Sequence, residues 1–452
     1  MKNEVKEFDS YLDLLKYSEQ SFAEEIFIET SIEKFRFRDF TRLVCSAASG
    51  LSNCQEKYIV LCVESPVKFA VLYFAVTLTD HVACLIPSGH KIPDKLSTSL
   101  QIDDGKADEL MEHEPFTWEN FSILDSKAPC TIAFSSGTTQ QEKGIVLSQY
   151  NLLQDTEYGM KRYRYWVGER LLHILPYWHL FGLVTDLLAP LHAGSRIYMS
   201  DSALFFFRDL KNYRPHSINL PPALADAICL AIENGNSCEQ VTGGCLQKIL
   251  CAGAPLSIST AKKLQNYGIL PCTAYGLTEC SPCISITSED DIRLGTSGIP
   301  LDCVKVKIAE DGEIQVCGTT VMLGYFEEVE ESRMKDGFFC TGDIGEIDDY
   351  GHLTILGRKS NMLVFSNGKK CMPEVVEQMI QKEVPGVEEC LLGYRDVKTT
   401  DIAKLTITSQ NKTVQLVDQV YEVMRSFGLY PCECVIQPEK LPRNAMGKVV
   451  RE

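Results

Sequence analysis

The sequence has little positive charge and no long uninterrupted apolar run. Its 452 residues contain 44 Lys and Arg against 61 Asp and Glu, which gives a formal net charge of −17. A surface of that sign repels phosphate polymers, so the composition argues against non-specific binding to nucleic acid or to an anionic membrane surface. Any anionic substrate must therefore meet a locally positive site.

Apolar segments are too interrupted to predict a membrane span. The longest, residues 68–87, contains Thr77, Thr79, Asp80 and His81 and is typical of a buried helix followed by a strand. The opening residues MKNEVKEFDS lack the hydrophobic centre of a signal peptide, which favours a cytoplasmic location. The sequence also lacks internal repeats and low-complexity linkers.

Disulfide and zinc patterns are absent too. The 19 cysteines are odd in number and lie mostly inside apolar runs, where free cysteine is commonly a small core hydrophobe. We therefore expect reduced, buried thiols. Cys280 and Cys283 form a CxxC pair without a second pair at zinc spacing, which argues against a metal or redox centre.

The remaining composition is that of an ordinary globular protein, with 45% hydrophobic and 23% charged residues. At about 150 residues per domain, the chain should hold two to three domains. From about Phe35 to Pro300, short β-branched runs alternate with longer amphipathic ones, which predicts α/β layers with largely parallel strands. Ser148 and Ser257 precede two predicted helices as caps.

The pattern changes after Pro300 to short alternating strands. Asp311-Gly312 is a favoured hairpin pair between two of them. From Arg358 onward, helices and strands alternate in a small α+β segment. We expect an N-terminal domain over residues 1–357 and a C-terminal domain over residues 358–452.

A segment rich in glycine, serine and threonine follows one predicted strand and ends at Lys143-Gly144. Small residues let backbone N–H groups approach an anion, hydroxyls donate to phosphate oxygens, and a nearby ammonium adds charge. It is not a Walker A loop, because Lys143 follows Glu142 and precedes a strand. Taken alone, the segment fits a polyphosphate site and a plain surface turn equally well. Its small and hydroxyl residues are Ser135, Ser136, Gly137, Thr138 and Thr139.

Four further segments accompany this phosphate loop. They are CAGAPLS from Cys251, CTAYGLTE from Cys272, DGFFCTGDIG with the following LGRKSNMLVFSNGKK, and the terminal LPRNAMGKVVRE. Together with the loop they resemble the adenylate-forming superfamily of acyl- and aryl-CoA synthetases, peptide-synthetase adenylation domains and luciferases. The resemblance extends from about Phe35 to the end of the sequence, and the pattern is most similar to that of acyl- or aryl-CoA ligases.

The resemblance implies a reaction and a fold. Members of the superfamily join a carboxylate to the α-phosphorus of ATP, release pyrophosphate and then let a thiol displace AMP from the acyl-adenylate. This implies ATP and Mg2+, with CoA or the phosphopantetheine of a carrier protein as the thiol acceptor. The implied fold is α/β: a large N-terminal domain of layered α/β subdomains plus a small β-barrel-like part, then a small mobile α+β C-terminal domain.

The segment CTAYGLTE would supply the centre of the ATP site. By resemblance, Tyr275 lies against the adenine beside Gly276, Thr278 touches the α-phosphate and Glu279 holds Mg2+, a hard cation that prefers oxygen ligands. Without the resemblance, a helix cap or the partner of a surface arginine explains Glu279 as well as a metal ligand does.

Two other segments would surround the nucleoside. Gly253, Ala254 and Pro255 resemble the wall beside the adenine. Asp343 resembles the carboxylate that accepts both ribose hydroxyls, and Arg358 resembles a cation that also reaches the ribose. The plainer interpretations are a strand-to-helix turn for the first three and a surface ion pair for the last two.

The C-terminal domain would supply the catalytic lysine, Lys448, whose ammonium can bridge the substrate carboxylate and the α-phosphate. Otherwise this residue is an ordinary solvated charge. The two steps need two arrangements of the small domain, and the hinge would be Ser360, where Lys or Asp is usual. The loop around Gly368 resembles the one that lines the thiol tunnel.

The phosphate loop departs from the family at two positions. Gln140 replaces the usual glycine and Glu142 replaces the usual proline. An extra carboxylate beside a triphosphate is unfavourable unless it points at solvent or pairs with Lys143, so weaker ATP affinity or a stiffer loop would follow. The residues expected to touch the nucleotide are all intact, which argues against a pseudoenzyme.

Residues 175–183, LPYWHLFGL, resemble the acid-pocket motif of acyl-CoA synthetases. His179 and Phe181 are the expected wall near the carboxylate, and we assign Gly182 and Ala274 to the same pocket. The aspartate with which peptide-synthetase domains hold an amino group does not follow His179 closely, which disfavours an α-amino acid. The apolar neighbours suit an aryl or aliphatic tail. A satisfied core histidine is the alternative for His179.

The leading hypothesis is an ATP-dependent acid–thiol ligase that acts on an aryl or medium aliphatic carboxylic acid and transfers the acyl group to CoA. A second hypothesis transfers it to a carrier protein. A third, from another class, is a degenerate nucleotide-binding protein without catalytic activity, suggested by Gln140, Glu142 and Ser360. We expect no nucleic-acid partner and no membrane-spanning segment.

Overall fold

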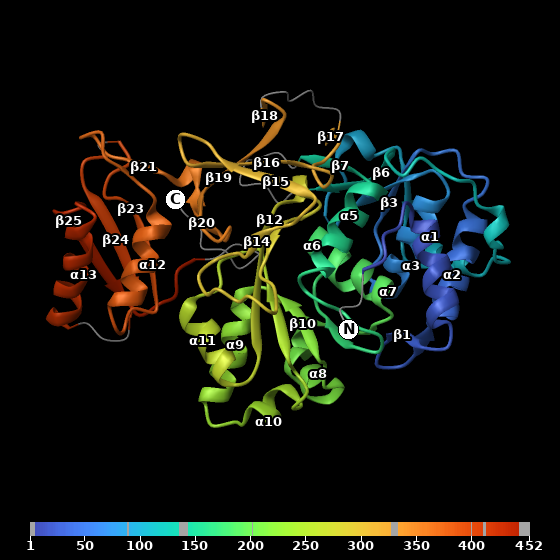
Figure 1. Cartoon of the computed structure of the whole chain (residues 1–452), viewed down its shortest axis with the longest axis horizontal. Coiled ribbons are helices and arrows are strands. Elements are labelled where there is room, and N and C mark those ends of the chain that lie inside the picture. The colour runs from blue at the N-terminus through green and yellow to red at the C-terminus, as the bar shows by residue number, and fades with distance from the viewer. Residues whose placement is uncertain are drawn as a thin grey trace. The chain divides into compact units, whose positions relative to one another are not determined.

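The structure is a computed structural model that describes residues 5–87, 90–134, 143–200, 202–326, 333–398, 400–409 and 413–442. The chain is an α/β protein in which helices accompany several separate sheets (Figure 1). The α/β layers predicted from the alternating sequence pattern are confirmed.

A six-stranded sheet holds the strand that leads into the phosphate loop. Its order is β17-β7-β6-β4-β3-β5, with parallel pairing among β3, β4, β5 and β6 and antiparallel pairing of β7 with β6 and of β17 with β7. Its strands are β3 (Tyr58–Leu61), β4 (Val82–Leu85), β5 (Leu100–Ile102), β6 (Pro129–Phe134), β7 (Gly144–Ser148) and β17 (Gly324–Tyr325). Nearby helices are α1 (Tyr11–Phe22), α2 (Phe37–Gly50), α3 (Pro66–Leu78) and α4 (Asp104–Met111).

A nine-stranded sheet has the order β14-β13-β12-β11-β10-β8-β9-β1-β2. Strands β1, β9, β8, β10, β11 and β12 run parallel, so their carboxyl ends lie at one edge. The strands are β1 (Ile26–Glu29), β2 (Lys34–Arg36), β8 (Arg170–His173), β9 (Arg196–Met199), β10 (Ser217–Leu220), β11 (Lys248–Cys251), β12 (Leu270–Gly276), β13 (Cys283–Ile286) and β14 (Ile299–Pro300).

Helix α5 (Gln149–Met160) leads from β7 of the six-stranded sheet to β8, and the other helices connect parallel strands of the nine-stranded sheet. Ser148 and Ser257 cap two of them, because each side chain accepts a hydrogen bond from the backbone N–H three residues on. Both predicted caps are therefore confirmed. The helices are α5 (Gln149–Met160), α6 (Leu180–Leu183), α7 (Ala189–Ala193), α8 (Phe206–Tyr213), α9 (Pro222–Glu233), α10 (Cys238–Thr242) and α11 (Ile258–Asn266).

The main core contains helix α3, which is buried continuously from Phe69 to Leu78. Strand β4 follows it, as predicted for residues 68–87. Within the described part of the chain, no helix combines the length and the apolar character that crossing a membrane would require.

All 19 cysteines lie in described positions and carry free thiols, and many of them are buried. Burial raises the pKa of the Cys45 and Cys84 thiols to about 12. A buried thiol with a raised pKa is unreactive, because the thiolate is the nucleophilic form. Free thiols, many of them buried, are consistent with the prediction of reduced, buried cysteines.

A five-stranded sheet follows, in the order β15-β16-β19-β18 with β20 beside β19. Gly312 has φ +84 at the predicted Asp311-Gly312 turn, which is a backbone conformation that glycine adopts without strain. The strands are β15 (Val304–Ile308), β16 (Glu313–Gly318), β18 (Met334–Lys335), β19 (Phe338–Ile347) and β20 (Leu353–Arg358).

The chain divides into two compact units, a larger one of Met1–Val306 with Val316–Phe339 and a smaller one of Lys307–Gln315 with Cys340–Glu452. The division passes through strands of the five-stranded sheet. The functional boundary expected near Arg358 stays a prediction.

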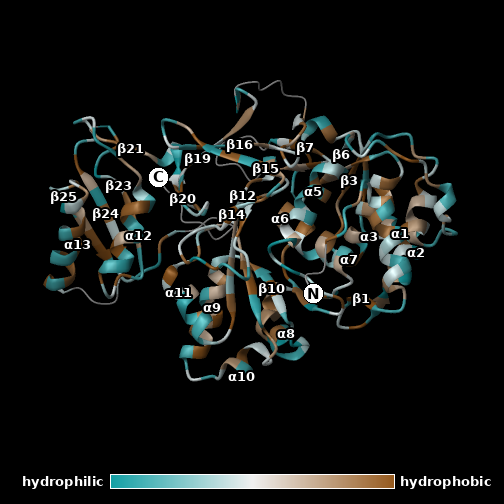
Figure 2. Ribbon diagram, in the orientation of Figure 1, coloured by the Kyte–Doolittle hydropathy of each residue, from teal (hydrophilic) through white to brown (hydrophobic). Residues whose placement is uncertain are grey.

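The smaller unit has its own hydrophobic core. Hydrophobic and hydrophilic residues alternate around its helix α13 (Figure 2), and Leu416, Val420, Val423 and Met424 are the buried ones. Its other elements are β21 (Leu363–Val364), β22 (Lys370–Cys371), α12 (Pro373–Glu383), β23 (Glu389–Tyr394), β24 (Ala403–Thr408), α13 (Val414–Ser426) and β25 (Cys432–Gln437).

Candidate active site

Most predicted site residues of the larger unit lie at the carboxyl edge of the nine-stranded sheet. Gly253, Ala254 and Pro255 follow β11 and are exposed, Tyr275 lies near the end of β12, and His179 lies in the segment after β8. Ligands of open α/β sheets bind outside the carboxyl ends of the strands. The topology thus brings the predicted adenine wall and the predicted acid-pocket segment to the same edge.

The end of β12 requires glycine at position 276. A Cβ atom there would lie 1.7 Å from the carbonyl oxygen of Pro282, which no side chain tolerates. Gly276 pairs with Cys283, and Tyr275 pairs with Ser285 one step earlier, across a β-bulge. The bulge ends the strand just before the turn that carries Thr278 and Glu279.

Glu279 lies in the short 3-10 turn Thr278–Cys280 and is 9% exposed. Its Oε1 accepts a hydrogen bond from the hydroxyl of Tyr325 at 3.1 Å, and Nη1 of Arg333 lies 3.4 Å from the same oxygen. The carbonyl oxygen of Glu279 accepts from the N–H of Met322 at 2.9 Å. The arginine pairing that the sequence left open is therefore present.

The donor chemistry of Glu279 fits Mg2+. Mg2+ is commonly held by one or two carboxylates together with substrate phosphates and water, so one protein carboxylate is enough. Across the described ranges, no group of three or more His, Cys, Asp or Glu side chains is arranged to hold a metal ion. Mg2+ held by the single carboxylate of Glu279 would take its other ligands from substrate phosphates and water.

Lys143 lies just before strand β7, and its ammonium is 5.0 Å from the centre of the Tyr325 ring. Gly144, which follows it, lies in a tight position, because a Cβ atom there would lie 3.0 Å from that of Phe326. The other predicted phosphate-loop residues and the two family departures fall outside the described residues; they are Ser135, Ser136, Gly137, Thr138, Thr139, Gln140 and Glu142.

In the smaller unit, Asp343 and Arg358 face each other across strands β19 and β20. Nε of Arg358 lies 2.8 Å from Oδ1 of Asp343, whose side chain is 6% exposed. The N–H of Asp343 donates to the hydroxyl of Thr341, and Nη1 of Arg358 donates to the carbonyl oxygen of Thr341. The two residues predicted at the ribose are thus held together by a direct ion pair and by shared contacts with Thr341.

The predicted hinge residue Ser360 is exposed in the 3-10 turn Lys359–Asn361. Its neighbour Lys359 pairs with Asp311 at 2.7 Å and with Glu313 at 2.8 Å, and these carboxylates raise its pKa. Gly368 has φ +81 in the turn between β21 and β22. Lys448 lies outside the described residues.

The acid-pocket segment forms the start of a helix. His179 caps α6, and its Nδ1 accepts a hydrogen bond from the N–H of Phe181 at 3.2 Å. Phe181 is 8% exposed, and a Cβ atom on Gly182 would lie 2.7 Å from the carbonyl oxygen of Pro176. The glycine therefore lets this helix pack against the preceding loop.

A buried polar cluster that the sequence did not predict lies behind this helix; we call His173, Asp186 and Asn219 the Asp186 cluster. Nδ1 of His173 lies 3.0 Å from Oδ2 of Asp186, and Nδ2 of Asn219 donates to Oδ1 of Asp186 at 2.7 Å. Asp186 is fully buried in the π-helical turn Val184–Leu188. Such turns are frequent at functional sites.

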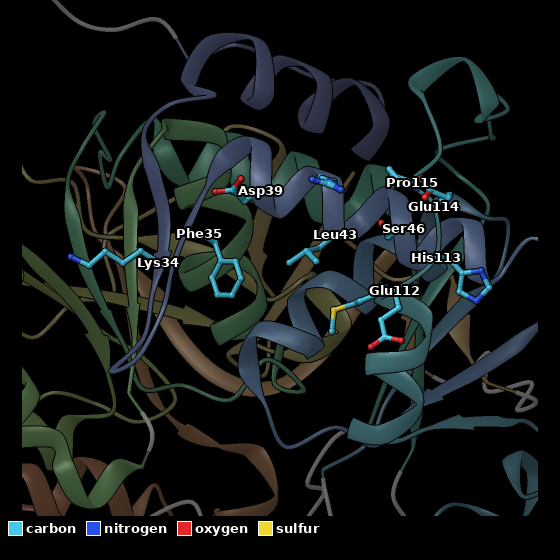
Figure 3. Close-up of a pocket in the computed structure, with 11 residues that line it drawn as sticks. Lys34, Phe35, Asp39, Leu43, Ser46, Glu112, His113, Glu114 and Pro115 are labelled. Atoms are coloured by element: carbon cyan, nitrogen blue, oxygen red, sulfur yellow. The ribbon is translucent and has the colours of Figure 1, made fainter.

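Two pockets formed by described residues lie elsewhere. One, of about 410 Å³, is lined by residues of β2, α2, the end of α4 and the segment after it, among them Asp39, Leu43 and His113 (Figure 3). The other, of about 400 Å³ in the smaller unit, includes Tyr421 and Cys434. Neither is lined by a predicted site residue, so neither identifies the acid pocket.

Comparisons with known proteins agree with the motifs. A family profile described as AMP-binding enzyme matches residues 70–326. The probable 4-coumarate–CoA ligase 3 of Dictyostelium discoideum is 27% identical over 72% of this chain and 63% of its own length. The long-chain-fatty-acid–CoA ligase FadD15 of Mycobacterium bovis is 27% identical over 58% of this chain and 51% of its own length. The chain thus spans about half to two thirds of these relatives.

Solved structures show the same fold. The anthranilate CoA ligase AuaEII in complex with anthranoyl-AMP superposes with a TM-score of 0.84 over 99% of this chain and 97% of the other, at 18% identity. At that identity the similarity concerns the fold alone. The large and small domains expected from the sequence resemblance agree with it.

Proposed function

The chain belongs to the AMP-binding enzymes, and on that basis we propose that it is an AMP-forming acid–thiol ligase. It activates a carboxylic acid with ATP, releases pyrophosphate and transfers the acyl group to the thiol of CoA. The main support is the family match over residues 70–326, which spans the phosphate loop and the segments around Gly253 and Glu279. The relatives named as CoA ligases support the choice of acceptor.

The first step joins a carboxylate oxygen to the α-phosphorus as the bond to pyrophosphate breaks. Negative charge accumulates around phosphorus, so catalysis rests on positioning and on cations. We assign contacts with the phosphates to Lys143, Thr278 and the loop residues 135–139, and the bridge between the carboxylate and the α-phosphate to Lys448. When bound at Glu279, Mg2+ would neutralise phosphate charge.

The nucleoside would lie between Tyr275 and the wall formed by Gly253, Ala254 and Pro255. We assign the ribose to Asp343 and Arg358. In the second step the thiol sulfur attacks the acyl carbonyl carbon, the bond to the AMP oxygen breaks, and AMP leaves. Movement of the C-terminal domain about Ser360 would take Lys448 out of the site between the two steps.

The proposed acid is an aryl or medium aliphatic one. Apolar side chains surround His179 and Phe181 in sequence, and the relatives include a ligase named for 4-coumarate and one named for long-chain fatty acids. An α-amino acid is disfavoured because no aspartate closely follows His179 in the sequence, and Asp186 is fully buried against His173 and Asn219.

ATP–pyrophosphate exchange across a panel of acids tests the proposal and names the acid. We expect exchange with a subset of aryl or medium aliphatic acids, followed by thioester formation with CoA. Thioester formation only with a carrier protein would favour that acceptor instead. Absence of exchange with every acid would contradict the proposal and favour a non-catalytic nucleotide-binding protein. If the protein is non-catalytic, Lys448→Ala should leave its function in cells unchanged.

A further inference from the structure

One side chain of the larger unit contacts two of the groups that we assign to the nucleotide. The hydroxyl of Tyr325 donates to Oε1 of Glu279 at 3.1 Å, and the Tyr325 ring lies 5.0 Å below the ammonium of Lys143. Tyr325 is 8% exposed and Glu279 is 9% exposed, so the hydrogen bond between them is largely shielded from water. Hydrogen bonds to charged groups and cation–π contacts gain strength in such surroundings.

The backbone around Tyr325 fixes this position. Tyr325 pairs with Ile145 in the β17–β7 ladder, and the N–H of Phe326 donates to the carbonyl oxygen of Gly144 at 2.7 Å. On the other side, the N–H of Met322 donates to the carbonyl oxygen of Glu279 at 2.9 Å. Five consecutive residues, 322–326, thus connect the strand after the phosphate loop with the turn that holds Glu279.

Arg333 is the second partner of Glu279. Its guanidinium contacts the same oxygen at the longer distance of 3.4 Å, and its side chain is 41% exposed. An ion pair this exposed contributes little free energy, so an incoming divalent cation can replace it. The Tyr325 hydrogen bond carries no charge of its own and can persist when a metal binds.

We propose that Tyr325 is a positioning residue of the nucleotide site and that Arg333 is the counter-ion which Mg2+ displaces. The Tyr325 hydroxyl restrains rotation of the Glu279 carboxylate and leaves its second oxygen for the metal. The Tyr325 ring holds the Lys143 ammonium beside the start of β7. This inference rests on the proposed function, because it assumes that the site binds ATP with Mg2+.

ATP binding without acid measures these roles without catalysis. Isothermal titration calorimetry gives the Kd for ATP in excess Mg2+ and in EDTA. The Kd in EDTA divided by the Kd in Mg2+, here called the Mg2+ ratio, measures how much the metal strengthens ATP binding. Tyr325→Phe removes the hydroxyl and keeps the ring, so the ratio should fall about fivefold while the Kd in EDTA stays unchanged. Tyr325→Leu should also weaken binding in EDTA, because it removes the ring below Lys143.

Tyr73→Phe is the matched control. Tyr73 is another buried tyrosine, and its hydroxyl lies 2.9 Å from that of Tyr11 and 3.0 Å from the hydroxyl of Thr131. Its loss should lower thermal stability without changing the Mg2+ ratio. An equal change of the ratio in Tyr73→Phe and Tyr325→Phe would show a general structural effect and overturn the inference.

Arg333→Gln should act in the opposite direction. Without the Arg333 guanidinium, the metal no longer competes with a cation for Glu279, so the Mg2+ ratio should rise about twofold. An unchanged ratio in Tyr325→Phe, or a lower ratio in Arg333→Gln, would overturn the respective role. If the wild-type protein binds no ATP in either condition, the proposed function itself fails; binding that strengthens with Mg2+ but ignores Tyr325 removes only this inference.

Discussion

Two buried polar clusters occupy opposite ends of the parallel strands of the nine-stranded sheet. The Asp186 cluster lies toward the carboxyl ends, where His173 ends β8 and Asn219 lies in β10. The Lys248 cluster, which we define as Glu169, Lys248 and Glu289, lies at the amino ends, where Glu169 precedes β8 and Lys248 begins β11.

The Lys248 cluster is a desolvated group of charges. Lys248 is 2% exposed, and its ammonium lies 2.7 Å from Oε1 of Glu289 and 3.6 Å from Oε1 of Glu169. It also donates to the carbonyl oxygen of Arg164 and lies 4.1 Å from the centre of the Tyr163 ring. A charge in such surroundings is tolerated only while its partners remain.

The Asp186 cluster supports a helix that carries predicted site residues. Its hydrogen bonds fix the π-helical turn that continues helix α6, and α6 presents His179 and Phe181. At the amino ends of the strands, Lys248 forms ion pairs with Glu169 and Glu289, and none of these three is a predicted site residue. The carboxyl ends use a buried carboxylate to orient a helix of the proposed acid pocket. We therefore expect mutations at the amino ends of the strands to change stability and mutations at the carboxyl ends to change acid binding.

The largest expected effect is that of Lys248→Ala. It leaves the Glu169 and Glu289 carboxylates without their cation, so the free energy of unfolding should fall by about 3–5 kcal/mol. Lys263→Ala is the control, since Lys263 pairs with Glu233 at 2.7 Å on the surface with 41% and 40% of the side chains exposed. The control should lose at most about 1 kcal/mol. Urea denaturation measures both, and equal losses would contradict the distinction.

The pH dependence of stability comes next. Burial raises the pKa of Glu169 from 4.5 to about 7, against the opposite effect of Lys248. Between these values the folded protein keeps a proton that the unfolded chain has released, so the free energy of unfolding falls as the pH rises, by up to about 3 kcal/mol.

Glu169→Gln should flatten that profile between about pH 5 and pH 7. Part of the slope should remain, because burial also raises the pKa of Glu157 to about 7. Urea denaturation at a series of pH values gives the difference between the variant and the wild-type protein. Two parallel profiles would show that Glu169 does not titrate with unfolding.

Asp186→Asn should have the smallest effect on stability, about 1–3 kcal/mol, because the shape and one acceptor oxygen are kept. The KM for the acid should rise several-fold while the Kd for ATP stays the same, since only the helix of the acid pocket loses its support. An equal change in both constants, or a change in neither, would remove the functional contrast between the two ends.

Local chemistry made much of the fold predictable. Ser148 and Ser257 are caps because a serine hydroxyl accepts from a backbone N–H three residues away, and Asp311-Gly312 is a turn because glycine permits the positive φ. The motif glycines were also recognisable, and the structure adds the reason for Gly276 and Gly182, which are crowded by backbone oxygens.

The missed residues have no local signal. Lys248 stands before an apolar run and looks like any lysine at the start of a strand, yet its partners are Glu169, 79 positions earlier, and Glu289, 41 positions later. Tyr325 is separated from Glu279 by 46 positions. A single sequence does not state which distant segments meet, because that depends on how the sheets pack.

The sequence by itself determined the family, the order of the motifs and the residue types that suit ATP, Mg2+ and a carboxylic acid, since these depend on short-range chemistry and on spacing along the chain. The tertiary structure alone decided which side chains share a partner. It placed Tyr325 between Lys143 and Glu279, set Arg333 beside the same carboxylate and buried Lys248 among its carboxylates. Such contacts arise when strand pairing brings remote segments together and removes water, and that burial gives each charge its dependence on its neighbours.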